Sequence, residues 1–209
     1  MQETAALIVV DLQRDFCPGG ALAVPGGDEI VPLVNELARP FETVVLTQDW
    51  HPAEHISFAA NHPGKAVFET IDLPYGPQVL WPTHCVMETP GAALHPGLHI
   101  PHASLIIRKG SHRNVDSYSA FLEADRTTRT GLDGYLRARG ITDLYICGLA
   151  LDFCVAWTAE DARNFGFNAA IIADACRAID LNGSLDAAWD RLDKAGVKRL
   201  RSPEILAHP

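Results

Sequence analysis

Short apolar runs recur along the chain without the alternation of apolar and polar residues that marks strands with one solvated face. They span residues 5–10, 43–47, 104–107, 144–147 and 169–173. Continuous runs of this length are typical of strands that are covered on both faces. We therefore predict a set of buried strands.

Helical stretches separate most of these runs. They span residues 28–39, 131–139, 153–165 and 185–195. Strands that alternate with helices favour a parallel sheet, because parallel neighbours need right-handed crossover connections. The pattern predicts a doubly wound α/β fold with a mostly parallel sheet and helices on both faces.

Two segments do not follow this pattern. Residues 49–101 are rich in Pro, Gly and His and show no sustained helix or strand period, and residues 110–130 are also irregular. Long loops in a compact domain are usually functional or disordered, and the aromatic residues in these loops favour order and function. We expect one domain over residues 1–209, with a metal-binding loop region at about 49–101.

Composition narrows the classes of protein that fit. A formal net charge of −9 and the lack of a basic stripe argue against nucleic-acid binding. The N-terminal apolar run has no basic leader and is interrupted by Asp11, which argues against a signal peptide or a membrane span. Five cysteines without a secretory signal indicate a reducing compartment, and we expect a cytoplasmic protein.

Polar residues close the predicted strands. Asp11, Asp49 and Lys109 end three of the apolar runs, and Cys154 follows a fourth at the start of a helix. Each alone could be structural, as a capping carboxylate, an extended lysine or a packed thiol. In open α/β sheets, however, ligands bind beyond the carboxyl ends of the strands, so we expect all four residues to face one crevice.

Cys154 is the best candidate for a nucleophile. The first turn of a helix and the nearby Lys109 would both favour its thiolate. If the thiolate hydrolyses an amide, the departing amine needs a proton, and Asp11 is suited to carry it. The main-chain N–H groups of Ala150 and Cys154, in the tight turn GLALDFC, are candidate oxyanion donors. We interpret the other four cysteines as structural.

The histidine-rich loop contains a candidate metal site. Asp49 and His51 are two residues apart, so both can point to the same side of an extended segment. His84 could supply a third ligand, with His55 or Ser57 as weaker candidates. Such a site suits zinc or iron, with manganese as a further option. The alternative is that these histidines cap turns or pair with carboxylates. The remaining histidines lack comparable spacing and are interpreted as surface or loop residues.

Five segments together resemble the bacterial nicotinamidases, within the isochorismatase-like cysteine hydrolases. The segments are VVDLQRDFCPGGALAVPGG, TQDWHPAEHISF, LWPTHCVMETPGA, RKGSHRNVDSYSAF and GLALDFCVAWTAEDA, in this order. The resemblance covers roughly residues 5–180. It implies a parallel six-stranded sheet and hydrolysis of nicotinamide to nicotinic acid and ammonia through a cysteine thioester.

The same resemblance implies roles for individual residues. Asp11, Lys109 and Cys154 would form the catalytic triad. Asp49, His51 and His84 would bind a metal whose open position accepts the pyridine nitrogen. The residues expected to line the substrate site are Phe16, Trp81, Tyr118 and Leu149. The Leu149–Ala150 peptide would be cis.

Other interpretations stay open at this point. A related amidase acting on an N-carbamoyl or ureido compound would keep the triad without needing the metal, so metal content separates the two hypotheses. Isochorismate hydrolysis is disfavoured, because those relatives lack the cysteine that this chain has at Cys154. A non-catalytic metal-binding module is a further alternative.

Leu151 departs from the Thr of many relatives, which weakens inferences about fine substrate preference. Pyrazinamide as a second substrate and assembly into a homo-oligomer are left open.

Overall fold

The main sheet of the computed structural model, which describes residues 3–207, contains six strands. In spatial order they are β5 (Leu105–Lys109), β2 (Thr43–Asp49), β1 (Ala5–Val10), β6 (Asp143–Gly148), β7 (Asn168–Cys176) and β8 (Lys198–Leu200). Every neighbouring pair is parallel. The predicted doubly wound parallel sheet is therefore confirmed. The short strand β8 was not predicted, since only three residues form it.

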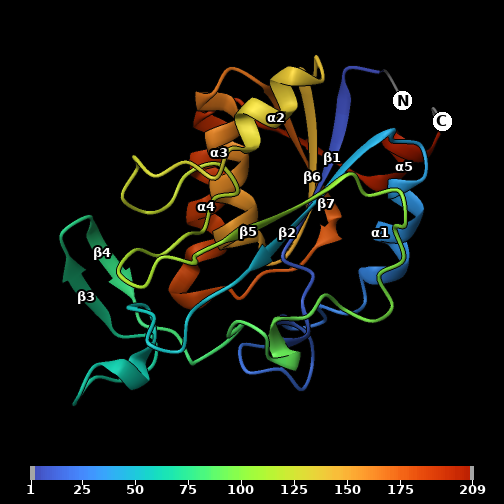
Figure 1. The fold of residues 1–209 in the computed structure, drawn as a ribbon. Helices are drawn as coiled ribbons and strands as arrows, with labels where there is room; N and C mark the ends of the chain where they lie inside the picture. The colour runs from blue at the N-terminus through green and yellow to red at the C-terminus, as the bar shows by residue number, and fades with distance from the viewer. Residues whose placement is uncertain (1–2, 208–209) are drawn as a thin grey trace.

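Helices cover both faces of this sheet. They are α1 (Val31–Ala38), α2 (Leu132–Ala138), α3 (Ala156–Asn164), α4 (Ser184–Lys194) and α5 (Ser202–Leu206). Figure 1 shows α2, α3 and α4 on one face and α1 with α5 on the other. None of the helices within residues 3–207 combines the length and apolar character needed to cross a bilayer.

Two helix starts differ from the prediction. The helix expected from residue 28 begins at Val31, where a proline occupies the first turn, a position that needs no main-chain donor. The helix expected over residues 153–165 is a π-helical turn, Leu151–Val155, followed by α3. Hydrophobic periodicity does not distinguish a single wider turn from an α-helix.

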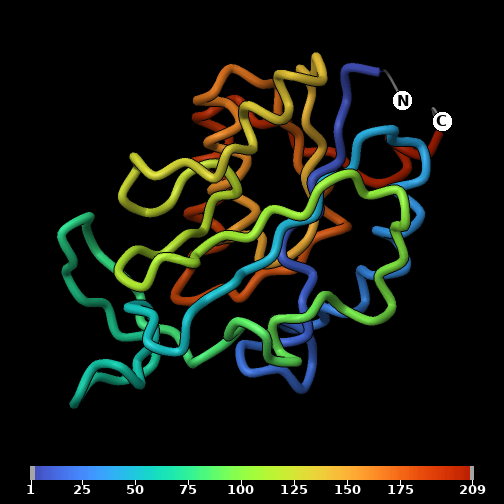
Figure 2. The backbone as a smooth tube through the Cα atoms, in the orientation of Figure 1, coloured from blue at the N-terminus to red at the C-terminus, as the bar shows by residue number. Residues whose placement is uncertain are grey.

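The long excursion between β2 and β5 contains a hairpin, which corrects the expectation that it holds no strand. Strands β3 (Thr70–Leu73) and β4 (Gly76–Val79) pair in antiparallel fashion. Each has four residues, and β4 includes a proline, so neither shows the alternation that identifies a strand. The tube in Figure 2 shows this excursion extending beyond the carboxyl ends of β1 and β2.

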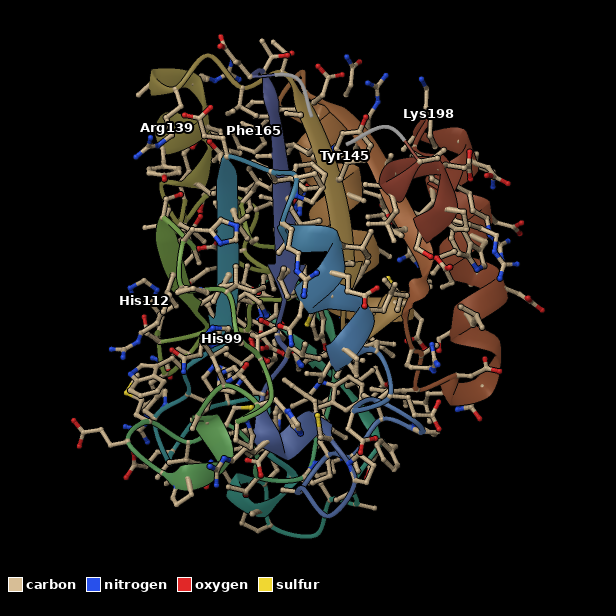
Figure 3. All side chains as sticks on the ribbon, turned by 90° about the vertical axis from the view of Figure 1, so that its right-hand side faces the viewer. His99, His112, Arg139, Tyr145, Phe165 and Lys198 are labelled. Atoms are coloured by element: carbon tan, nitrogen blue, oxygen red, sulfur yellow. The ribbon has the colours of Figure 1, made fainter. Side chains whose placement is uncertain are left out.

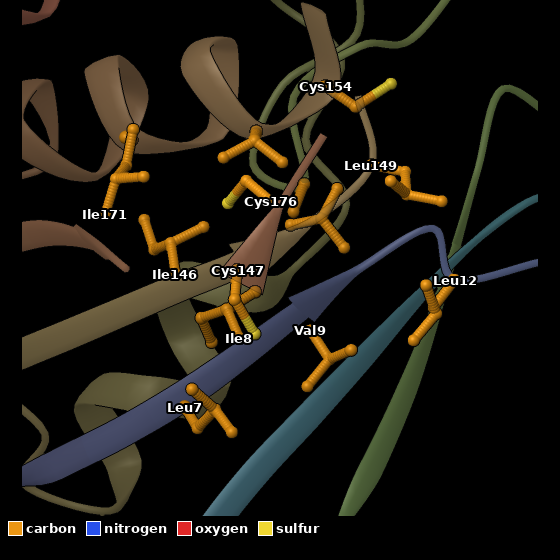
Figure 4. Packing of buried hydrophobic residues seen from close by; sticks show 14 of the residues in the cluster. Leu7, Ile8, Val9, Leu12, Ile146, Cys147, Leu149, Cys154, Ile171 and Cys176 are labelled. Carbon is orange, nitrogen blue, oxygen red and sulfur yellow. The ribbon is translucent and has the colours of Figure 1, made fainter. Parts of the chain in front are cut away.

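The core explains why the central strands are apolar, whereas the edge strands β5 and β8 are partly exposed, which corrects the expectation that residues 104–107 are covered on both faces. Every residue of β1 is buried, because the strand lies in the interior of a sheet covered on both faces. Figure 4 shows Leu7, Ile8 and Val9 packed beside Ile146 and Cys147 of β6. Burial of these side chains is the main stabilising contribution of the sheet.

The chain reverses its direction of winding between β1 and β6. The connections after β1 place β2 and β5 on one side, and the later strands continue from β6 on the other. At this point Gly148 has φ 120°, and a Cβ there would lie 2.1 Å from the Val10 carbonyl oxygen. Only glycine allows this approach, which brings the residues after β1 and β6 together at the switch point, where ligands bind in such folds.

Candidate active site

Lys109, at the end of β5, contacts the other three polar residues predicted to meet beyond the strands. Its Nζ lies 2.8 Å from Asp11 Oδ2 and 3.4 Å from Cys154 Sγ, and it also donates to Asp49 Oδ1. A further bond of 2.9 Å goes to the Ser117 carbonyl. The ammonium is buried, so these partners replace its lost hydration. The two carboxylates outweigh the effect of burial and raise the pKa of Lys109 well above its usual value.

Asp11 presents one oxygen to the protein and the other to the site. Thr47 Oγ1 donates to Asp11 Oδ1 at 2.5 Å, while the Asp11 main-chain N–H donates to the same hydroxyl oxygen at 3.0 Å. Oδ2 faces Lys109 but has no hydrogen bond of regular geometry within residues 3–207. Burial raises the pKa of Asp11 to about 6, although the Lys109 charge opposes the rise. A carboxyl group in this state is suited to proton transfer near neutral pH.

Cys154 lies within the π-helical turn after β6, with 6% of its surface exposed (Figure 4). Burial, with the nearby carboxylates of Asp11 and Asp49, raises the pKa of the thiol well above its usual value, and Lys109 only partly opposes this. The sequence-based expectation of a favoured thiolate was therefore wrong. That expectation counted the cation and the helix start but not the burial or the two carboxylates.

The turn before Cys154 presents an unused main-chain donor. The Leu149–Ala150 peptide is cis, as the resemblance implied. The Leu151 N–H donates to the Arg177 carbonyl at 2.8 Å, whereas the Ala150 N–H has no main-chain acceptor in the described part of the chain. Ala150 and Cys154 line the same pocket. This arrangement fits the predicted oxyanion donors.

Asp49, His51 and His84 form a compact group of ligand atoms, all within 4.8 Å of one another. The Nε2 atoms of His51 and His84 lie 3.6 and 3.9 Å from Asp49 Oδ2. Both Nδ1 atoms face main-chain carbonyls, at 2.8 Å from Gly110 for His51 and 2.7 Å from Pro82 for His84. Because a carbonyl only accepts, Nδ1 carries a proton, and in the neutral ring Nε2 keeps its lone pair for a metal. The three donors therefore fit a divalent metal ion.

The carboxylate of this group is held in its ionised form. Burial opposes ionisation of Asp49, but Lys109 and the two histidines outweigh it and hold the pKa of this carboxyl below its usual value. Oδ1 accepts from Lys109, which leaves Oδ2 directed at the histidines.

Gly110 sets the position of the His51 ring. Its φ is 68°, and a Cβ added there would lie 2.4 Å from His51 Cε1. The close approach lets the Gly110 carbonyl meet His51 Nδ1. A side chain at this position would displace the imidazole.

The weaker metal candidates, His55 and Ser57, lie beside the group but bond to other partners. The His55 ring centroid is 4.2 Å from that of His51. Its Nδ1 is 2.7 Å from Ser57 Oγ, and its Nε2 is 3.1 Å from the Val115 carbonyl. His55 also belongs to a second possible ligand group with His51 and Asp116. Other histidines, such as His99 and His112 labelled in Figure 3, are not in these groups.

A pocket opens between the thiol and the metal-ligand group. Of the predicted residues it is lined by Phe16, Asp49, His51, Trp81, His84, Tyr118, Ala150 and Cys154. The prediction that Leu149 lines the substrate site was wrong. Leu149 is completely buried and does not line the pocket, and its side chain packs near Gly27. Its place beside Ala150 in the sequence did not reveal this inward direction.

Sequence reasoning missed part of the pocket wall. The additional lining residues are Leu22, Asp116, Phe153 and Ile179. Phe153 packs edge-on against Trp81, with ring centroids 4.9 Å apart. Trp81 Nε1 donates to the Tyr118 hydroxyl at 2.9 Å. The aromatic residue next to Cys154 was the one available signal, whereas the others come from loops whose course cannot be inferred from periodicity.

The doubly wound sheet and the polar residues at its switch point define the chain as an α/β protein with a site suited to nucleophilic hydrolysis. It belongs to the isochorismatase family, since the model of the Isochorismatase domain matches residues 5–203.

The known proteins similar to this chain include nicotinamidases and pyrazinamidases. The nicotinamidase of Acinetobacter baylyi is 63% identical over 201 residues, which cover 96% of this chain and 94% of that protein. The solved nicotinamidase/pyrazinamidase of Acinetobacter baumanii superimposes with a TM-score of 0.98 at 60% identity, covering 99% of this chain and 100% of the other. The pyrazinamidase of Pyrococcus horikoshii in complex with zinc gives a TM-score of 0.77 at 37% identity, covering 95% and 99%.

Proposed function

We propose that this chain is a nicotinamidase that hydrolyses nicotinamide to nicotinic acid and ammonia through a thioester on Cys154, and that it also accepts pyrazinamide. The observation that carries the proposal is the contact of Lys109 Nζ with Asp11 and Cys154 beside a pocket that also contains the Asp49, His51 and His84 donors. The thiol, carboxylate and ammonium suit amide hydrolysis. The donor group suits a substrate whose ring nitrogen can bind a metal. The similarity to the Acinetobacter nicotinamidases supports the same substrate.

Asp49, His51 and His84 would hold one divalent metal ion, zinc or iron in the first instance and manganese as a further option. When bound, the ion supplies a Lewis-acidic position that anchors the pyridine nitrogen. The donor chemistry and the zinc complex of the Pyrococcus pyrazinamidase support this assignment. His55 or Ser57 would assist metal binding indirectly.

Three aromatic residues would flank the substrate ring, because they line the pocket: Phe16, Trp81 and Tyr118.

In the first half of the reaction, Asp11 takes the proton of the Cys154 thiol as the sulfur attacks the amide carbon. The developing oxyanion accepts hydrogen bonds from the Ala150 and Cys154 N–H groups. Asp11 then gives the proton to the leaving nitrogen, and the C–N bond breaks to release ammonia. Lys109 keeps Asp11 and the sulfur in register throughout.

In the second half, water replaces ammonia and attacks the thioester. Asp11 accepts a proton from this water, the C–S bond breaks, and the proton returns to sulfur as nicotinic acid leaves. The pKa of about 6 lets Asp11 serve in turn as base and acid. One water is consumed, and Cys154 returns to its starting thiol.

The alternative substrate, an N-carbamoyl or ureido compound, is not favoured. Such a compound offers no ring nitrogen for the Asp49, His51 and His84 group. The solved N-carbamoylsarcosine amidase of Thermoplasma acidophilum is 23% identical to this chain, a likeness of fold alone.

We further infer that the chain forms one domain, acts in the cytoplasm on a small-molecule substrate, and uses neither nucleic acid nor membrane as a partner. The five free cysteines and the net charge of −9 support this interpretation. Assembly into a homo-oligomer stays open to measurement.

Ammonia release from nicotinamide by the purified protein tests the proposal, with metal content measured on the same sample. We expect release by the wild-type protein and its loss in Cys154→Ala. Cys17→Ala is the matched control, because Cys17 is a buried thiol outside the pocket. Full activity in Cys154→Ala, or no release by the metal-loaded wild-type protein, would refute the proposed reaction.

A further inference from the structure

Gln13 completes the sheet beside Asp49. The chain leaves the sheet after β1, where Asp11 adopts a left-handed conformation with φ 45°, while β2 continues to Asp49. The Gln13 side chain takes the place of the missing strand: the Asp49 N–H donates to Gln13 Oε1 at 2.8 Å, and Gln13 Nε2 donates to the Asp49 carbonyl at 2.8 Å. A side-chain amide thus binds both main-chain groups of Asp49 as a neighbouring peptide would.

The same amide connects Asp49 to the loop that follows His84. Gln13 Nε2 also donates to the Ala92 carbonyl at 2.8 Å. Around this bond, the Arg14 N–H donates to the Ala93 carbonyl, and the His95 N–H donates to the Leu12 carbonyl. Gln13 is completely buried, so none of its bonds can be exchanged for water without opening the site.

The loop is held at its beginning by the same segment. Asp15 Oδ2 accepts the N–H of Cys85 at 2.7 Å, and Cys85 directly follows His84. Cys85 has φ 45°, a conformation that a non-glycine residue adopts only where its surroundings fix it. The segment after Asp11 therefore holds the main chain at two of the three metal donors.

We propose that Gln13 is a positioning residue for the metal site, which fixes Asp49 relative to His84 and thereby sets metal affinity. This inference rests on the proposed function, because it presumes that Asp49, His51 and His84 hold a metal. Gln13 touches neither the ligand atoms nor the substrate pocket. Residues that hydrogen-bond to metal ligands and orient them change the metal affinity by about 10- to 100-fold when they are replaced.

Gln48 provides a matched control. Its Nε2 donates to the same Ala92 carbonyl at 2.8 Å, and it is likewise buried, but its amide makes no bond to the main chain of Asp49. Replacing Gln48 by Met removes a buried amide, its bond to the loop and the bond of 3.3 Å that its Oε1 accepts from Arg108 Nε. Replacing Gln13 by Met removes the same kind of bond and also the two bonds to Asp49.

Metal affinity of the full chain, measured by competition with a chromophoric chelator for Zn²⁺, tests this role. We expect binding to be weaker by at least about tenfold in Gln13→Met and by no more than about threefold in Gln48→Met. The visible absorption of the Co²⁺-loaded protein should change in Gln13→Met, because it reports the geometry of the ligands. If Gln13→Met does not fold, Gln13→Asn serves instead, since its shorter amide cannot reach both Asp49 and Ala92.

The outcomes separate this inference from the proposed function. If the wild-type protein binds Zn²⁺ and Gln13→Met, or Gln13→Asn used in its place, binds it equally well, the positioning role alone is overturned. Equal losses in the Gln13 and Gln48 variants would also overturn it, because the shared bond to Ala92 would then account for the effect. Wild-type protein that does not bind Zn²⁺ or Co²⁺ at all would remove the metal site itself, and both conclusions with it.

Discussion

Lys109 Nζ lies 2.8 Å from Asp11 Oδ2, and neither side chain is exposed. The same ammonium also contacts Asp49, so a single cation balances two buried carboxylates. In Lys109→Met these carboxylates would lose the cation that they share. We expect loss of activity and a fall of about 3–5 kcal/mol in the free energy of unfolding, measured with urea at pH 7.5.

The control for this variant is Lys65→Met. Lys65 pairs with Glu69 on the surface, where both side chains are well exposed, so its loss should change stability by less than about 1 kcal/mol. A Lys109→Met protein as stable as Lys65→Met would contradict the idea that Lys109 neutralises the site.

The acid limb of the pH profile should report Asp11. The proposed mechanism needs the carboxylate form, which is lost as the pH falls through the pKa of about 6. We expect kcat/KM to be level above pH 7 and to fall toward about tenfold per unit below pH 6. Asp11→Asn should be inactive at every pH.

Thr47→Val tests the assignment of this limb. The Thr47 hydroxyl donates to Asp11 Oδ1 and lowers the pKa of that carboxyl. Its removal should move the acid limb to higher pH. A limb that stays in place in Thr47→Val would assign the titration to another group.

Removal of the metal should weaken substrate binding. We expect chelated protein, and His84→Ala, to show a KM for nicotinamide raised at least about tenfold, because the ring nitrogen loses its anchor. Zinc should restore the chelated protein but not the variant. His99→Ala is the control, since His99 is exposed and outside the ligand groups. An unchanged KM in fully metal-stripped protein would argue against the anchoring role.

The Tyr118 hydroxyl orders the aromatic wall of the pocket. It accepts hydrogen bonds from Trp81 Nε1 at 2.9 Å and Gln78 Nε2 at 3.2 Å. Tyr118→Phe would leave the buried indole N–H without this acceptor, a cost of about 1–3 kcal/mol. We expect a higher KM with a smaller change in kcat, measured by steady-state ammonia release. Equal KM values would show that the bond does not position Trp81 for binding.

The sequence predicted the parallel sheet and the convergence of Asp11, Lys109 and Cys154 because both follow from local pattern. Buried strands are continuous apolar runs, and polar residues that end parallel strands share one edge of the sheet. The spacing of Asp49 and His51 is local in the same way. These features needed no knowledge of how the loops run.

What was missed depends on contacts between distant segments. The hairpin β3–β4 lacks a strand pattern, and Asp116 reaches the pocket only through the path of a long loop. The high pKa of Cys154 arises from burial beside the carboxylates of Asp11 and Asp49, which follow and end two other strands. Leu149 points inward because of the backbone of a single turn, which residue type alone does not specify.

Gly110 limits how this pocket could be redesigned. The loop that begins there also supplies Asp116 and Tyr118, which makes it an attractive segment for libraries aimed at bulkier amides. Any side chain at position 110 would collide with the His51 ring. Such libraries should therefore keep this glycine fixed and place their diversity at the later pocket-lining positions of the loop.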